Sequence, residues 1–109
     1  MSLDIYAVID TGGAAPVELG WLNITHNVHE QIEVAGGADP WGWEGMPIAD
    51  TIGALRLCLA ALEDRQREEE LRRFDASNGW GRLENSREFV RKLLALAEAH
   101  PKARWHVSR

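Results

Sequence analysis

The 109-residue chain contains one cysteine, and its first fifty residues contain no lysine or arginine. A single cysteine excludes a disulfide within the chain, which is typical of proteins from a reducing compartment. No apolar run approaches the roughly 18 residues that a transmembrane helix needs. The start, MSLDIYAVID, lacks the basic segment and long apolar run of a signal peptide. We therefore expect a cytoplasmic protein without a membrane partner.

The two halves of the chain differ in charge. Residues 1–50 hold eight of the 17 acidic residues, and all twelve basic residues lie in the second half. Nucleic-acid-binding proteins usually present a basic surface over one face, which the first half cannot supply. We therefore expect no nucleic-acid partner. The simplest interpretation of the asymmetry is that the two halves attract each other in the fold.

Three segments have the pattern of β-strands. Residues 3–10, LDIYAVID, alternate between an apolar face and a second face that carries both aspartates. This period of two predicts a half-buried strand. Residues 16–24 form a second candidate, which could pair with the first as a hairpin. The terminal ARWHVSR alternates again, so we expect residues 103–108 to pair with the first strand.

Apolar spacing predicts three main helices. The first covers residues 27–35, with Asn27 as its N-cap and Glu30 completing a capping box. The second covers residues 48–62, and a charged continuation or short extra helix follows over residues 63–75. The third runs from 83 or 86 to 99. The apolar stripe of the second helix comprises Ile48, Ile52, Leu55, Leu59 and Leu62.

The predicted order of elements is strand, strand, helix, helix, helix, strand. This order favours an α+β fold, with a small, mostly antiparallel sheet of about three strands and about three helices packed on one face. The length predicts a single domain over residues 1–109. With 45% hydrophobic residues, a chain of this size can bury a core of its own.

Two polar segments, NITHN and SNGWG, each adjoin the predicted start of a helix. Free N–H groups and a positive potential at helix starts suit a polar or anionic small molecule. If the helices pack side by side, the two segments could meet around one pocket, with a tryptophan stacking on a planar ligand. Alternatively, each residue has a local role as a cap, a turn or a core side chain. The predicted ligand-binding residues are Asn23, Thr25, His26, Asn27, Asn78, Gly79 and Trp80.

The pair of motifs also resembles a known family. NITHN, then NGWG about fifty residues later, then a terminal VSR, is similar to a group of small proteins of actinobacteriophages and their hosts. The resemblance covers nearly the whole chain, including the start MSLDIY. It implies that the seven predicted ligand-binding residues form a shared signature. It also implies a phage accessory or prophage role.

Other functions have less support in the sequence. His26, His29, Glu30 and Glu33 are candidates for acid–base catalysis, but no nucleophile motif or phosphate-binding glycine loop accompanies them. Three of these side chains could share a helix face as metal ligands, although a structural zinc site normally has four. We therefore predict no catalysis, no metal and no cofactor. The main alternative is a protein-interaction module, or an inhibitor of a host factor, that acts through the acidic first half; the oligomeric state is not predicted.

Overall fold

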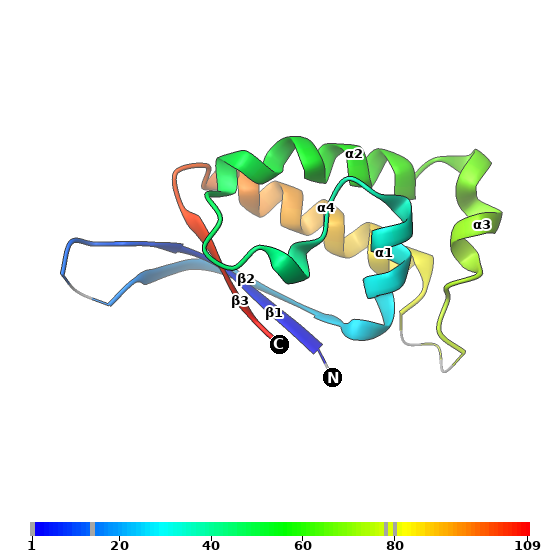
Figure 1. The fold of residues 1–109 in the computed structure, drawn as a ribbon, viewed down its shortest axis with the longest axis horizontal. Coiled ribbons are helices and arrows are strands. Elements are labelled where there is room, and N and C mark those ends of the chain that lie inside the picture. Colours follow the sequence, from blue (N-terminus) through cyan, green and yellow to red (C-terminus); the bar gives the residue numbers. More distant parts are fainter. Residues whose placement is uncertain (1, 14, 78, 80) are drawn as a thin grey trace.

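The computed structural model contains a three-stranded antiparallel sheet with its helices on one face (Figure 1). It describes residues 2–13, 15–77, 79 and 81–109. The strands are β1 (Ser2–Ile9), β2 (Val17–Thr25) and β3 (Arg104–Ser108), in the spatial order β2-β1-β3. The predicted α+β fold is confirmed, including the hairpin of the first two strands and the pairing of the last strand with the first.

In the part of the chain that the structure describes, four α-helices and four short 3-10 turns lie between the second strand and the third. The helices are α1 (His29–Ala35), α2 (Ile52–Leu62), α3 (Glu68–Arg72) and α4 (Leu83–Ala99). The 3-10 turns are η1 (His26–Val28), η2 (Pro40–Gly42), η3 (Ile48–Thr51) and η4 (Arg65–Arg67). Among the described residues, no helix combines the length and the apolar character that crossing a membrane requires.

The sheet turns its apolar face toward the helices. Leu3, Ile5 and Ala7 of β1 are fully buried, as their period of two predicts. In β3 the corresponding residue is Trp105, which is also fully buried. Its indole Nε1–H donates to Thr51 Oγ1 at 3.0 Å, so the edge strand is joined to the turn that precedes α2.

The longest helices, α2 and α4, pack against each other above the sheet (Figure 1). The predicted stripe of the second helix is confirmed, because Ile48, Leu55 and Leu62 are fully buried. The other two members of the stripe are half-buried. The charged segment after α2 forms η4 and α3, and Leu71 anchors it in the core.

The first helical segment begins differently from the prediction. Thr25, not Asn27, is the N-cap, and its Oγ1 accepts a hydrogen bond from the Asn27 N–H at 3.4 Å. The reason is that β2 stays extended through Thr25, and the chain then makes one 3-10 turn before α1. The helix ends at Gly36, as predicted, with a φ of 89° that favours glycine.

A buried polar network connects three helical segments. Gln31 of α1 is fully buried and donates both amide hydrogens, to Leu71 O and to Asp75 Oδ1, each at 2.9 Å. The Gln31 Oε1 accepts from the hydroxyl of Ser86 in α4. Asp75 Oδ1 also accepts from the Leu83 N–H at 2.8 Å. The network therefore fixes α1, the end of α3 and the start of α4 relative to one another.

Candidate functional site

The two predicted motif segments come together at Gly81 and Asn27. Gly81 is buried with a φ of +101°, and a Cβ placed on it would lie 2.7 Å from the Cβ of Asn27. Only glycine allows the backbone to approach so closely in this conformation. Gly79 is exposed, whereas the predicted ligand residues Asn78 and Trp80 lie outside the described residues.

The side chains of NITHN point to different places. Asn23 is exposed, and its amide donates to Asp4 Oδ1 at 2.7 Å, beside the indole of Trp21, which donates to the same oxygen at 3.3 Å. A cavity of about 210 Å³ next to Asn23 lies between β2 and α4, where Phe89 and Lys92 form part of its wall. Among the described residues, the hollow beside Asn23 is thus completed by α4 and not by Gly79 or Gly81.

His26 instead packs against the ring of Trp41. The two rings meet edge to face, with centroids 6.0 Å apart and planes at 72°. The Nε2 atom of His26 and the Nε1 atom of Trp41 are both buried, and neither has a hydrogen-bond partner among the described residues. A buried polar group without a partner typically costs about 1–3 kcal/mol. This pair of nitrogens is therefore a place where a polar ligand would gain hydrogen bonds.

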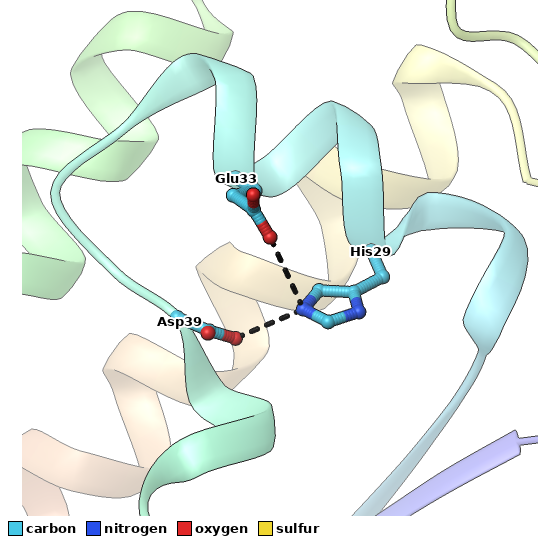
Figure 2. A group of neighbouring side chains, drawn as sticks. All are labelled: His29, Glu33 and Asp39. Atoms are coloured by element: carbon cyan, nitrogen blue, oxygen red, sulfur yellow. Dashed lines mark hydrogen bonds and ion pairs between the residues drawn. The ribbon is translucent and has the colours of Figure 1, made fainter.

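A histidine that also contacts the Trp41 ring meets two carboxylates. His29 stacks on that ring, with centroids 4.1 Å apart and planes at 15°. Its Nε2 lies 3.1 Å from Asp39 Oδ1 and 3.6 Å from Glu33 Oε2 (Figure 2). The His29 side chain is 34% exposed, and the two carboxylates are more exposed. The three side chains form one cluster at the surface, which we call the His29 cluster.

Local geometry brings these three side chains together. Glu33 follows His29 by four positions, so both lie on the same face of α1. Gly36 and Gly37 have φ values of 89° and 86°, and they turn the chain back toward the start of the helix. A Cβ on Gly37 would lie 3.1 Å from the backbone oxygen of Ala54 in α2, so a side chain at this position would also crowd α2. The turn places Asp39 opposite His29.

Arg67 holds the end of α1 in place. Its guanidinium donates to the carbonyl oxygens of Ala35 at 2.9 Å and Val34 at 3.0 Å, and it also pairs with Glu70. These carbonyls belong to the last turn of α1, where no later helical N–H would otherwise satisfy them. Arg67 therefore fixes the end of the helix that carries His29 and Glu33.

The sequence did not identify Asp39 as part of a site. The spacing of His26, His29 and Glu33 suggested one possible ligand face, but His26 packs edge to face with Trp41 instead. Asp39 occupies the third position of the cluster instead. The only signal for this residue is the Gly36-Gly37 pair shortly before it, because two glycines permit a sharp return of the chain.

A second histidine–carboxylate contact lies on the exposed face of the sheet. His106 Nδ1 is 3.0 Å from Glu44 Oε1, and the Val107 N–H donates to Glu44 Oε2 at 2.6 Å. That N–H and the neighbouring His106 hold the pKa of Glu44 below its ordinary value. The contact borders a hollow of about 480 Å³, whose wall includes Tyr6 and Arg104. The contact between His106 and Glu44 contains one carboxylate, whereas the His29 cluster contains two.

Comparison with known proteins adds no relative: no family model matches the chain, no curated protein is similar to it, and no solved structure matches it.

Proposed function

We propose that this protein is a small binding module for a polar small molecule, such as a nucleotide. The proposed site is the corner where η1 meets Gly81. The proposed site includes His26 and Asn27 of the NITHN motif and Gly79 of the NGWG motif. A phage accessory role, which the resemblance of the NITHN and NGWG motifs implies, belongs to the same proposal.

The observation that carries the proposal is the pair of buried nitrogens without partners. His26 Nε2 and Trp41 Nε1 belong to two adjoining rings, next to the point where Gly81 packs on Asn27. A nucleotide offers both hydrogen-bond donors and acceptors, so it can satisfy either tautomer of the imidazole and the indole N–H. Both nitrogens are out of contact with solvent, so a ligand reaches them only when neighbouring side chains move.

The test is a thermal-shift measurement with a broad panel of nucleotides. A ligand that binds only the folded state raises the melting temperature as its concentration exceeds the dissociation constant. We expect at least one nucleotide to raise it, and we expect His26→Ala to abolish the rise. His106→Ala is the matched control, because His106 lies on the exposed face of the sheet, and it should keep the full shift.

Two results would contradict the proposal. The first is no shift with any nucleotide of the panel. The second is a shift that His26→Ala and His106→Ala reduce equally, since that would move the binding site away from the corner. Circular dichroism of both variants shows whether the fold is intact.

A second candidate function is a protein-interaction module, or an inhibitor of a host factor, that acts through the acidic first half. It is favoured by the β1–β2 hairpin, which extends beyond the helices (Figure 1). Four of the five large apolar side chains that the described residues expose lie on this hairpin; they are Ile9, Val17, Leu19 and Trp21. Exposed apolar residues gathered on one element are typical of contact surfaces.

The acidic residues near this hairpin indicate a partner with a basic surface. Glu18 is exposed beside the apolar side chains of β2, and no basic residue occurs in residues 1–50. A capture experiment from bacterial lysate would test the candidate with Trp21→Ser and Glu18→Lys, both of which should weaken capture of the same protein. Leu57→Ser is the control, because Leu57 is 69% exposed on α2. Equal capture by all variants would exclude this surface.

A further inference from the structure

We propose that the His29 cluster is a binding site for a divalent transition-metal ion such as Zn²⁺. The ligands are Nε2 of His29 and one carboxylate oxygen each from Glu33 and Asp39. This inference does not rest on the proposed binding of a small molecule, because it uses different side chains and a different kind of ligand.

The spacing of the three donor atoms fits one metal ion. Zinc bonds to nitrogen and oxygen are about 2.0–2.2 Å long, which separates two ligands of a tetrahedral site by about 3.3 Å. His29 Nε2 lies 3.1 Å from the Asp39 oxygen and 3.6 Å from the Glu33 oxygen. All three ligand atoms lie within 4.8 Å of one another. Small rotations of the two exposed carboxylates would complete the coordination geometry.

The types of donor select the class of metal. An imidazole nitrogen suits zinc and its neighbours in the first transition series, whereas Ca²⁺ and Mg²⁺ prefer sites made of oxygen alone. The ring of His29 is already oriented, since it stacks on Trp41, which is only 3% exposed. Three protein ligands leave a further position for water or another molecule, as in zinc sites that are open to a ligand.

The charge of the surroundings also favours a cation. His29 is the only partner that ion pairs give Glu33 and Asp39 within the part of the chain that the structure describes. Arg67 lies near the end of α1, but its guanidinium donates to the carbonyl oxygens of Val34 and Ala35 and pairs with Glu70. When His29 is neutral, the cluster therefore carries two negative charges, which a divalent ion would balance.

The test is calorimetric titration of Zn²⁺ into protein freed of metal with a chelator. We expect one ion per chain, and we expect Asp39→Asn and His29→Gln each to weaken binding about tenfold or more. His106→Ala is the matched control, because His106 faces only one carboxylate, and it should bind Zn²⁺ like the wild type. Co²⁺ in place of Zn²⁺ should give a visible absorption band that the Asp39→Asn variant changes.

The possible outcomes separate the proposal from its alternatives. Absence of Zn²⁺ binding, equal binding by wild type and Asp39→Asn, or a preference for Mg²⁺ would each overturn it. If His29→Gln fails to fold, Asp39→Asn and Glu33→Gln replace exposed side chains and decide the question alone. Because Zn²⁺ is added without any nucleotide, failure here leaves the thermal-shift experiment unaffected, and the reverse also holds.

Discussion

Replacing Gln31 with leucine should destabilise the protein strongly, although the two side chains are similar in size. The Gln31 amide makes three hydrogen bonds, with the backbone oxygen of Leu71, with Asp75 and with the hydroxyl of Ser86. All three are lost, and the Ser86 hydroxyl remains buried without this partner. Because leucine fills nearly the same volume, the cavity contribution should be small.

The size of the effect follows from these contacts. A neutral hydrogen bond contributes about 1 kcal/mol net, and one to a charged group contributes about 1.5–3 kcal/mol. Leu71 O keeps a bond from the Phe74 N–H, and Asp75 keeps the Leu83 N–H, so part of the cost is relieved. We expect Gln31→Leu to lower the free energy of unfolding by about 3 kcal/mol, a large share of the roughly 5–15 kcal/mol typical of a domain.

Urea unfolding measures this change through a lower midpoint with an unchanged slope. Ser86→Ala alone should cost about 1 kcal/mol. In the double variant, the unpaired hydroxyl is removed, so the combined loss should be smaller than the sum by about 1 kcal/mol. Gln66→Leu is the control for an exposed glutamine and should change stability by less than about 0.5 kcal/mol. A loss below about 1 kcal/mol for Gln31→Leu, or strict additivity with Ser86→Ala, would refute this reasoning.

Further outcomes are predicted for individual residues. Burial raises the pKa of the Cys58 thiol to about 11, so a thiol reagent at pH 8 should react only after addition of denaturant. Gly81→Ala should cost about 2–3 kcal/mol in urea unfolding, because its φ of +101° disfavours a side chain. Gly53→Ala, at an exposed position of α2, should instead raise the free energy of unfolding by about 0.5–1 kcal/mol. The pKa of Glu84 is lowered from 4.5 to about 2, chiefly by its hydrogen bond to Arg72. The resulting stability is present above about pH 4.5 and is lost as the pH falls toward 2. Glu84→Gln should therefore reduce the fall of the melting temperature over this range, by a small amount because the pair is exposed.

The strands and helices could be predicted from the sequence because apolar residues recur with a different period in each. Alternation in residues 3–10 indicates a strand, and the 4, 3, 4, 3 spacing after Ile48 indicates a helix. The cap was misplaced by two residues because Thr25 and Asn27 are both good caps, and only the length of β2 decides between them.

The polar groupings were harder to predict, because they depend on distances across the fold. Gln31 and Ser86 are 55 positions apart, and neither belongs to a motif. Asp39 lies next to His29 because two glycines with positive φ turn the chain between them. No periodic pattern in the sequence specifies the geometry of that turn. In contrast, the close approach of Gly81 to Asn27 follows an expectation from the sequence, since a glycine permits that backbone contact.

The pairing of β1 with β3 has a consequence for the order in which the protein folds. Asp4 lies opposite Ser108, so this pairing joins positions that are far apart along the sequence. During synthesis on a ribosome, β1 can form its hairpin with β2 early, but its other edge stays without a neighbour until residues 104–108 emerge. Contacts so distant along a polypeptide slow folding, because a long loop must close before they form. Between the emergence of β2 and that of β3, the nascent chain therefore carries an edge of β1 without a neighbouring strand.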